Sequence, residues 1–575
     1  MGNQRAVAQV VESPFAVDLD IPAVDIPSYT FHRPKSYDKS SPLYFDAKNP
    51  SVRFSLEEAE LYVKRLAIGL QNLGLQPEDK VLLLSPNSVF FPIVLWGVLA
   101  AGCVFTGASP TASVFELSHQ LRDSEAKVIF AAPPQLDVAL KAAAKVGLDP
   151  SCVYVFDGAL ESSSSRSPRS WKSIWAPTQA AQGWRWRSIT SLEEAQNKTA
   201  IINYSSGTTG LPKGVELSHY NLVAQVEQII FKRGRVADSE DGRARHGRLV
   251  ESGERWLAAL PMYHAFGQTY YAMIAPQVGA KVFIMTKFNL LEFLTYIDIY
   301  RITFVNVVPT IVKMLAKVPF PSRFNLKSLQ IVGSGSAPLD LEAAQAVNEK
   351  FLRPGVCIKQ GWGMTETTCN VTGFAPDDVD DGRSIGWVNP TCRVRITPVP
   401  ERNFSNIERE RGVTVGEIWV AGPNVMKQYW KKPKETASTV VEAEGCRWVQ
   451  TGDIGYVDNR GCLYIIDRIK ELIKVKGLQV SPAELEEALL TKPGVLDAAV
   501  VGVKIGDNEC PRAFVVRGNA DVTAEVLDDL IKSNFAPHKW LTGGIFFIEK
   551  VPRSGIGKVL KRELPNPTEK RQAKI

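Results

Sequence analysis

Short apolar runs with β-propensity alternate with helical segments along most of this 575-residue chain, and this alternation constrains the fold more than any other feature. Four of the runs are Lys127–Ala131, Lys281–Met285, Thr303–Val308 and Leu329–Val332. Each is followed by helical spacing or a helix-capping pattern, as at Ser336. Such alternation is typical of parallel sheets covered by helices. We therefore predict an α/β protein, long enough for two to four domains.

One segment, Val81–Phe105, contains no charged residue and is long enough to span a bilayer. Pro86, Asn87 and Pro92 interrupt it. A buried strand followed by a buried helix explains this pattern better than a membrane span does. We therefore predict no transmembrane segment.

Composition excludes several classes of protein. With 45% hydrophobic and 22% charged residues, the chain is neither disordered nor fibrous. Its eight cysteines form no C-x-x-C pair and its six histidines do not cluster with them, which favours reduced thiols over disulfides or zinc. The net charge of +6 is mild and would suit an anionic small ligand.

Two polar segments are predicted to be solvent-exposed loops, namely residues 161–173 and the arginine-rich residues 232–254. The second could be a nucleic-acid patch, but it lacks interleaved aromatic residues and contains several acidic ones. A solvated insertion is the better interpretation, and we expect no nucleic-acid partner.

The pattern of predicted elements changes after Asp467. A strand, a helix entered through Ser481-Pro482, two strands, a further helix and a last strand precede a basic tail. This predicts a large N-terminal domain over residues 1–467 and a smaller α+β domain over residues 468–575, joined near Lys470.

The strongest motif is Tyr204-Ser-Ser-Gly-Thr-Thr-Gly-Leu-Pro-Lys-Gly-Val215. Its glycines allow a tight turn that presents backbone N–H groups to a phosphate, and Lys213 adds a positive charge. It is not the P-loop of kinases and GTPases, because Pro212 and Gly214 flank that lysine. The hydroxyl donors of the loop are Ser205, Ser206, Thr208 and Thr209.

This loop resembles the phosphate loop of the adenylate-forming superfamily, which includes acyl-CoA synthetases, firefly luciferases and adenylation domains. The other motifs of the family follow in the expected order, so the resemblance covers nearly the whole chain. It is most similar to 4-coumarate–CoA ligases and to aryl- or phenylacetyl-CoA ligases of the fungal peroxisomal type. The resemblance implies that the smaller C-terminal domain is mobile and carries a catalytic lysine.

The resemblance assigns the nucleotide site to several motifs. In Gln360-Gly-Trp-Gly-Met-Thr-Glu-Thr367, Trp362 would stack on adenine, Thr365 would touch the α-phosphate and Glu366 would hold Mg²⁺. Asp453 and Arg468 would hold the ribose. Taken alone, Trp362 could be a core residue and Asp453 a turn residue. The full set assigned to ATP or AMP is Ser205, Ser206, Gly207, Thr208, Thr209, Gly210, Lys213, Ser336, Gln360, Gly361, Trp362, Thr365, Asp453, Arg468 and Lys558.

The same resemblance assigns the moving parts and the CoA site. Lys558, in Pro552-Arg-Ser-Gly-Ile-Gly-Lys-Val559, would be the catalytic lysine, and Lys470 would be the hinge. Glu417 is expected to have a structural role. The residues assigned to CoA are Lys287, Lys474, Lys476 and Gly477, although isolated lysines such as Lys287 are often only solvated.

The motif Pro261-Met-Tyr-His-Ala-Phe266 matches the family's acyl-pocket segment. His264 would sit where acid, adenylate and thiol meet, although a lone histidine is more often a packed structural group. The pocket residues implied are Tyr263, His264, Phe266, Tyr270, Ser334 and Gly335. Because Tyr270 is bulkier than the residue typical of hydroxycinnamate enzymes, we expect an altered, shallower pocket and doubt that coumarate is the substrate.

The implied reaction joins a carboxylic acid to coenzyme A through an acyl-adenylate. It consumes ATP, requires Mg²⁺ and releases pyrophosphate and AMP. Aryl, phenylacetyl and medium-chain acids all fit an apolar pocket. Three alternatives remain open: a stand-alone adenylation enzyme that loads a carrier protein, a luciferase-like oxygenase, and a non-enzymatic membrane or scaffold protein.

The two ends of the chain bear on its location. The start lacks the charged-then-apolar run of a secretory signal, and Ala6 stands where a myristoylation motif needs Ser or Thr. The last three residues, Ala573-Lys574-Ile575, are a conservative variant of the S-K-L address. We expect recognition by the peroxisomal import receptor, with a cytoplasmic location as the alternative.

Overall fold

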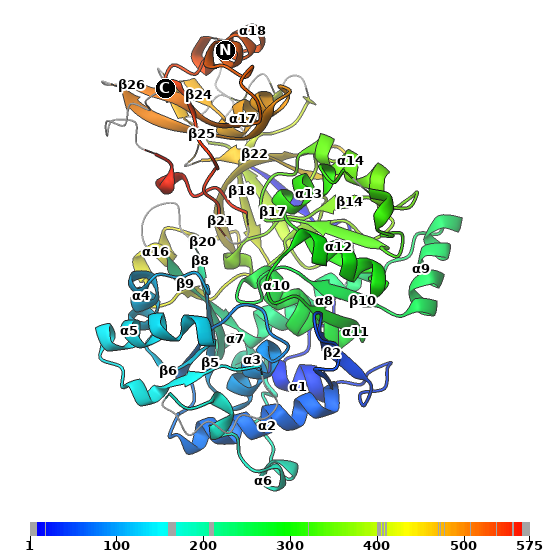
Figure 1. The fold of residues 1–575 in the computed structure, drawn as a ribbon, viewed down its shortest axis with the longest axis vertical. Coiled ribbons are helices and arrows are strands. Elements are labelled where there is room, and N and C mark those ends of the chain that lie inside the picture. Colours follow the sequence, from blue (N-terminus) through cyan, green and yellow to red (C-terminus); the bar gives the residue numbers. More distant parts are fainter. Residues whose placement is uncertain are drawn as a thin grey trace.

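The computed structural model shows a large lobe and a smaller one, drawn in orange and red at the top of Figure 1. The structure describes residues 8–15, 17, 19–158, 168–205, 212–319, 321–399, 404, 407–408, 411–469, 471, 473–475, 478–505, 508–535, 537–554 and 557–565.

The first sheet of the large lobe has seven strands in the order β19-β9-β8-β5-β4-β6-β7. The five strands from β8 to β7 run parallel, and β9 and β19 are antiparallel additions at one edge. Its strands are β4 (Lys80–Leu84), β5 (Val104–Ala108), β6 (Ala126–Ala131), β7 (Val153–Val155), β8 (Thr199–Ser205), β9 (Lys213–Ser218) and β19 (Gln428–Tyr429). The helices that follow or cover them include α2 (Leu56–Asn72), α3 (Phe91–Ala100), α4 (Val114–Ser124) and α5 (Leu136–Val146).

The second sheet also has seven strands, in the order β14-β13-β12-β10-β11-β2-β3, and only the β2–β3 pair is antiparallel. Its strands are β2 (Pro42–Asp46), β3 (Arg53–Ser55), β10 (Arg255–Ala258), β11 (Lys281–Ile284), β12 (Phe304–Val307), β13 (Ile331–Ser334) and β14 (Ile358–Gln360). The helices along this part of the chain are α8 (His219–Arg233), α9 (Glu240–Ser252), α12 (Leu290–Ile299), α13 (Pro309–Ala316) and α14 (Leu341–Phe351). One continuous hydrophobic core joins the two sheets. The predicted α/β class is confirmed.

The third sheet is antiparallel and completes the large lobe. It consists of β1 (Gln9–Glu12), β17 (Arg393–Thr397), β18 (Gly416–Ala421), β20 (Val440–Ala443), β21 (Cys446–Val457) and β22 (Leu463–Arg468). Arg468 is therefore the last residue of a large-lobe strand, although the predicted small domain begins with it. The predicted joint at Lys470 lies outside the described residues.

The small lobe has a hydrophobic core of its own, built from residues 473–547. Its elements are β23 (Ile473–Val475), β24 (Leu478–Val480), α17 (Pro482–Leu490), β25 (Val495–Ile505), β26 (Asn508–Arg517), α18 (Ala524–Asn534) and β27 (Ile545–Phe547). Ser481 caps α17 by accepting a hydrogen bond from Glu484 N at 3.3 Å, as the Ser-Pro signal predicts.

The uncharged segment forms β4, the buried helix α3 and β5, as predicted. Each helix among the described residues is too short or too polar to cross a bilayer. All eight cysteines are free thiols.

Two predictions about loops are wrong. The segment 232–254 contains the helix α9, which projects at the right of Figure 1. Arg245 is buried because Asp377 neutralises it through bonds of 2.5 and 3.0 Å, and Lys232 is buried because it donates to the carbonyls of Gly373 and Trp387. Long-range partners that composition does not reveal therefore hold this segment.

The second error concerns the end of the serine-rich segment 161–173, of which 161–167 lie outside the described residues. Trp171 is fully buried, with its ring against Phe90, Phe130 and Phe156, because three aromatic side chains supply an apolar site for it. In a smaller correction, the helix expected at Ser336 begins only at Leu341, where Asp340 provides the cap.

Candidate active site

The neighbouring strands β21 and β22 place Asp453 directly opposite Arg468. Arg468 Nε donates to Asp453 Oδ1 at 2.6 Å, and Trp362 Nε1 donates to Asp453 Oδ2 at 2.9 Å. The Asp453 side chain is only 4% exposed. The structure thus brings together three residues that were assigned to the nucleotide from separate motifs, with both oxygens of the carboxylate engaged.

Glu417 supports the turn that carries Asp453. It accepts hydrogen bonds from Gly452 N at 3.1 Å and from Trp419 Nε1 at 2.9 Å. Burial raises the pKa of Glu417 above its ordinary value. These contacts agree with the structural role expected for this residue.

Glu366 lies in the short helix η6 (Thr365–Thr367) and faces the ends of the predicted phosphate loop. Its Oε1 accepts hydrogen bonds from Ser205 Oγ at 3.0 Å and from Tyr429 OH at 2.8 Å. Lys213 Nζ lies 4.1 Å from the centre of the Tyr429 ring. One described end of the loop therefore bonds this buried carboxylate, and the other contacts its tyrosine partner. Ser206, Gly207, Thr208, Thr209 and Gly210 lie outside the described residues.

Sequence reasoning missed Tyr429. It comes from β19, the short edge strand paired with β9, and no motif marks it. Burial raises the pKa of its phenol, and the neighbouring Glu366 adds to that effect. Tyr429 therefore remains a neutral hydrogen-bond donor to Glu366 at physiological pH.

The backbone just after Glu366 is strained. Thr368 has φ 66° and ψ −52°, a conformation that β-branched residues rarely adopt. Its hydroxyl donates to Asn424 O at 2.6 Å, and Met426 N donates to Glu366 O at 2.9 Å. Two long-range bonds thus hold the strained turn and fix the backbone of the carboxylate.

The predicted catalytic lysine approaches the same place from the small lobe. Burial and the nearby Arg468 guanidinium lower the pKa of Lys558, and the carboxylates of Glu471, Asp453 and Glu366 act in the opposite direction. Lys558 N donates to Ser554 Oγ at 3.2 Å, and Ser554 N donates to Lys558 O at 2.8 Å. The lysine therefore sits on a tight turn within the field of the nucleotide-side charges.

This turn rests on the large lobe through Gly557, which is buried and has φ 81°. A Cβ atom at this position would lie 2.5 Å from Thr310 Oγ1, at the start of α13. Only glycine fits here, because the backbone conformation is left-handed and the space is closed.

Two ion pairs brace the lysine turn within the small lobe and toward the joint. Arg553 binds Asp497 at 2.8 Å and donates to Gly557 O at 2.9 Å. Lys561 pairs with Glu471 at 3.0 Å. Lys561 therefore connects the lysine segment to the residue just beyond the predicted hinge.

On the acyl side, His264 caps the short helix α10 (Ala265–Gly267) by accepting from Phe266 N through Nδ1 at 3.4 Å. Burial lowers the pKa of His264 to about 4, so the ring is neutral at pH 7. Since Nδ1 is an acceptor, the proton is on Nε2. A π-helix, η4 (Gln268–Ile274), follows directly, and such helices often occur at functional sites.

The π-helix carries Tyr270 into an aromatic cluster. The ring of Tyr270 meets that of Phe266 edge-on at 5.3 Å and stacks on that of Phe304 at 5.7 Å. Gly335 borders the same cluster, because a Cβ there would lie 3.5 Å from the Phe266 ring. Tyr270 thus occupies space between Phe266 and Phe304, and the shallower pocket expected from its size stays a prediction.

Other predicted residues hold the frame of the site. Gly361 N donates to Ser334 O at 2.9 Å. The Gln360 amide is committed to the backbone of Leu339 and Gly382, at 3.2 and 2.9 Å. Tyr263 packs against Gly107 of β5, Ser336 is exposed with φ 82°, and Thr365 is half-buried at the start of η6.

The described structure does not bring together the residues that were assigned to CoA. Lys287 is exposed after β11. The backbone of Lys474 lies in β23, while its side chain, and Lys476 and Gly477, lie outside what is described.

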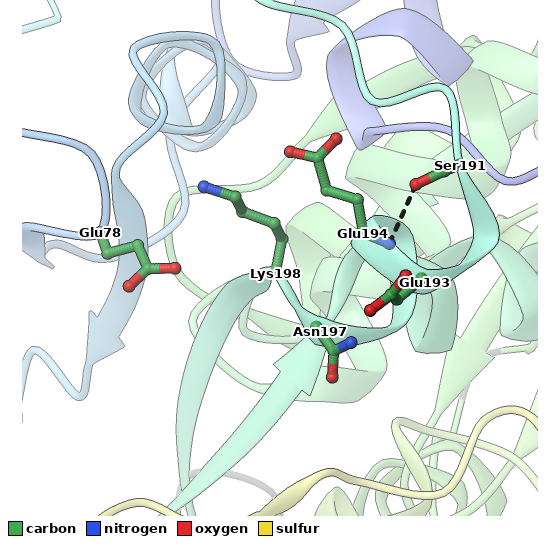
Figure 2. A pocket seen from close by; sticks show the side chains of 6 residues that line it. All are labelled: Glu78, Ser191, Glu193, Glu194, Asn197 and Lys198. Carbon is green, nitrogen blue, oxygen red and sulfur yellow. Dashed lines mark hydrogen bonds between the residues drawn. The ribbon is translucent and has the colours of Figure 1, made fainter.

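A surface hollow of about 280 Å³ is separate from all these residues (Figure 2). It is lined by Glu78, Ser191, Glu193, Glu194, Asn197 and Lys198. Within it, Ser191 Oγ accepts from Glu194 N at 3.2 Å, which is an ordinary helix cap. The hollow contributes nothing to the site.

Two helix-covered sheets, an antiparallel third sheet and a lysine turn presented by a second lobe define an adenylate-forming enzyme. Residues 35–430 match the AMP-binding enzyme family, and residues 484–558 match the AMP-binding enzyme C-terminal domain. The chain belongs to the AMP-binding enzyme family, which confirms the resemblance found in its motifs.

Individual relatives agree with this assignment. The chain is 36% identical to a putative acyl-coenzyme A synthetase of Emericella nidulans, over 95% of this chain and 96% of that one. It is 32% identical to the phenylacetyl-CoA ligase epaB of Aspergillus niger, over 95% and 97%, and 34% identical to a 4-coumarate:CoA ligase of Petunia hybrida, over 95% of each. Among solved structures, ATP-bound MatB from Rhodopseudomonas palustris has 26% identity and a TM-score of 0.76, covering 94% of this chain and 97% of that one.

Proposed function

We propose that this AMP-forming acid–CoA ligase activates an apolar carboxylic acid, either aryl, phenylacetyl-like or medium-chain, and transfers it to CoA. The observation that carries the proposal is the meeting of Asp453, Arg468 and Lys558 on one side of a site whose other side is the Phe266–Tyr270–Phe304 cluster. The first side suits a nucleotide, and the second suits a hydrocarbon.

In the first half-reaction, a carboxylate oxygen of the acid attacks the α-phosphorus of ATP and pyrophosphate leaves. Negative charge grows on the α-phosphoryl oxygens, where the Lys558 ammonium and Thr365 would donate hydrogen bonds. A preorganised donor of this kind contributes about 3–4 kcal/mol in typical enzymes. Asp453 would accept hydrogen bonds from the ribose hydroxyls, and Arg468 holds that carboxylate in place.

Glu366 fits a magnesium ion. Both of its hydrogen bonds fall on Oε1, and carboxylate oxygens are ligands that Mg²⁺ prefers alongside phosphate and water. Among the described residues there is no cluster of three or more His, Cys, Asp or Glu side chains that could hold a metal. We propose that Glu366 holds Mg²⁺ together with the phosphates of ATP, where the ion neutralises phosphate charge.

In the second half-reaction, the CoA thiolate attacks the acyl carbon and AMP leaves. A free thiol with a pKa of about 8.5 is a few per cent thiolate at pH 7, so the nucleophile is available without a protein base. Neutral His264 lies on the acyl side, where its Nε2–H would donate a hydrogen bond to the reacting groups. We propose that the lysine turn, which now rests on Thr310, swings away about Lys470 to admit the thiol.

The test is pyrophosphate exchange into ATP over a panel of aryl and aliphatic acids, followed by AMP release with and without CoA. We expect exchange with at least one acid and AMP release that depends on CoA. AMP release that needs a carrier protein instead, or light emission and oxygen uptake with the acyl-adenylate, would replace this proposal by one of the alternatives.

We also propose that the tail Ala573-Lys574-Ile575 directs the enzyme to peroxisomes, which suits an enzyme of acyl-CoA metabolism. The tail lies outside the described residues. A fluorescent protein fused ahead of the last twelve or so residues should colocalise with a peroxisomal marker. Uniform cytoplasmic fluorescence would contradict this proposal.

A further inference from the structure

Buried polar atoms without hydrogen-bond partners gather around the acyl side of the site. Among the described residues these include Arg233 Nε and Asn306 Nδ2. Buried polar groups are nearly always paired, and an unpaired one costs about 1–3 kcal/mol. Two such atoms on the side of the sheet that carries Phe304 therefore need an explanation.

Asn306 lies on β12, two residues after Phe304, so both side chains project from the same face of the sheet. Gly333 is directly opposite Asn306 on β13, and a Cβ atom at Gly333 would collide with Asn306 Oδ1. The glycine leaves room for the amide to lie across the neighbouring strand. Asn306 is 2% exposed, and its Nδ2 donor has no partner.

Arg233, the last residue of α8, lies beyond Phe304. Its guanidinium carbon is 4.4 Å from the centre of the Phe304 ring and 4.7 Å from that of Trp256. It forms an ion pair with Glu254, and its side chain is 8% exposed. The charge of Arg233 is thus neutralised while its Nε–H remains unpaired, so this end of the site offers donors without net charge.

The direction of β12 sets the depth of these groups. Gly557 of the lysine turn docks at Thr310 and Val308, just beyond the carboxyl end of β12, which marks the catalytic edge. At a rise of about 3.3 Å per residue, Asn306 lies about 7 Å deeper than Val308 and Phe304 about 13 Å deeper. Asn306 is therefore placed to meet the far part of a bound acid rather than its carboxylate.

We propose that the natural acid carries a neutral hydrogen-bond acceptor, such as an ether, carbonyl or hydroxyl oxygen, at the end remote from its carboxylate, and that Asn306 Nδ2 donates to it. Arg233 Nε–H lies further in and suits a second acceptor or a bridging water. A distal carboxylate is disfavoured because Glu254 already neutralises the arginine. The inference rests on the proposed function and narrows its substrate class.

The unpaired Asn306 donor also predicts that the enzyme discriminates between acids with and without a distal acceptor. A hydrocarbon acid would fill the same space but leave the Asn306 donor unpaired, whereas an acceptor would pair it. Sites built to bond a polar substrate group reject the analogue that lacks it more strongly than apolar pockets reject a missing methylene. An acid with the acceptor should therefore be activated at least about tenfold better than its isostere.

The test uses pairs of acids that differ only by an oxygen in place of a methylene group. The pairs are 4-methoxyphenylacetate and 4-ethylphenylacetate, 4-methoxycinnamate and 4-ethylcinnamate, and 7-methoxyheptanoate and nonanoate. The readout is kcat/KM for pyrophosphate exchange. We expect the oxygen-containing acid to be preferred about tenfold in at least one pair. Ratios within twofold in every pair that is activated would overturn the inference.

The variant Asn306→Leu keeps the size of the side chain and removes the donor. We expect it to abolish the preference while it retains activity with the hydrocarbon acid and the KM for ATP, which also shows that it is folded. Asn306→Asp, which has an acceptor in place of the donor, should lose activity with the methoxy acid selectively. The control is Asn325→Leu, at an exposed asparagine.

A preference that survives Asn306→Leu would overturn the role of Asn306. Failure of every acid to support exchange would instead refute the proposed function, so the two failures are distinguishable. If both Asn306 variants lose exchange with all acids, the ratio measured on the unaltered enzyme still decides whether a distal acceptor is preferred.

Discussion

The nucleotide side and the acyl side of the site are held together in different ways. On the nucleotide side, Asp453 is bonded to Arg468 and Trp362, and Glu366 is bonded to Ser205 and Tyr429. On the acyl side, aromatic rings pack together while buried polar atoms such as Asn306 Nδ2 stand without partners. The two carboxylates of the first side are already paired within the protein, whereas by our proposal the second side acquires its missing bonds from the ligand.

This difference matches the chemistry each side performs. ATP is the same for every member of the family, so its contacts can be preorganised within the protein. The acid varies between relatives, whose names include phenylacetyl-CoA and 4-coumarate–CoA ligases. A side that differs between relatives is expected to include residues outside the shared motifs, such as Asn306.

The sharpest way to test the comparison is to remove the lysine that completes the nucleotide side. Lys558→Ala should lower the rate of acyl-adenylate formation about a hundredfold to a thousandfold, because it removes a donor to the developing charge. Thiolation of supplied acyl-AMP should be spared, as measured by thioester formation. The control is Lys550→Ala, at an exposed lysine of the same lobe. Equal loss of both half-reactions would contradict this division of labour.

A second test breaks the carboxylate at the centre of the nucleotide side. Asp453→Asn should raise the KM for ATP about tenfold to a hundredfold, because Arg468 loses its charged partner and the ribose loses an acceptor. The KM for the acid should change little in steady-state exchange assays. Asp458→Asn serves as a control, at a turn carboxylate that pairs with Arg460 on the surface. A parallel rise in both KM values would mean that the two sides are not independent.

A third test alters the acyl side alone. Tyr270→Ala should shift the preference toward bulkier acids by about tenfold, because it removes the ring between Phe266 and Phe304. The KM for ATP should remain unchanged. Tyr270→Phe keeps the ring and is the matched control. If Tyr270→Ala leaves the ranking of acids unaltered, this tyrosine does not limit the pocket.

The smallest effect is expected from a residue that belongs to neither side. Burial raises the pKa of Glu486 to about 7, with Asp467 and Glu471 adding to the rise and Lys561 opposing it. Because this folded-state pKa exceeds the unfolded value of about 4.3, the folded state binds the proton more tightly. The stability that this carboxyl contributes is therefore present below pH 4.3 and is lost as the pH rises through 7.

Glu486→Gln mimics the protonated form and keeps an acceptor for Val500 N. It should stabilise the small lobe by about 1 kcal/mol at pH 8 and have little effect at pH 5. Urea denaturation at the two pH values measures this difference. Glu487→Gln, at the exposed neighbour, should show no such pH dependence. An equal effect at both pH values would exclude titration of Glu486 as the cause.

The comparison also explains what the sequence could and could not predict. Asp453 and Arg468 were recognisable from their motif, and the antiparallel pairing of β21 with β22 places them opposite each other. Arg233 was assigned to a solvated segment. It is buried because its ring partners, Trp256 and Phe304, come from two other strands. Contacts of that kind depend on the tertiary fold, and no local pattern encodes them.

The fold shows the same division. The alternation of apolar runs predicted the parallel strands around Lys127 and Lys281, because period and flanking turns are local signals. The helix α9 was missed, although Ser239 caps it, because its glycine- and arginine-rich composition favours a loop. Its ion pair between Arg245 and Asp377 is a long-range contact.

Gly557 gives the domain motion a simple requirement. While the turn is seated at Thr310, the lack of a side chain matters twice, because the backbone has φ 81° and a Cβ atom would lie 2.5 Å from Thr310 Oγ1. Adding one methyl group there should hinder closure for adenylation. One added carbon atom at this position would then stop the catalytic cycle before the mixed anhydride of acid and nucleotide is made.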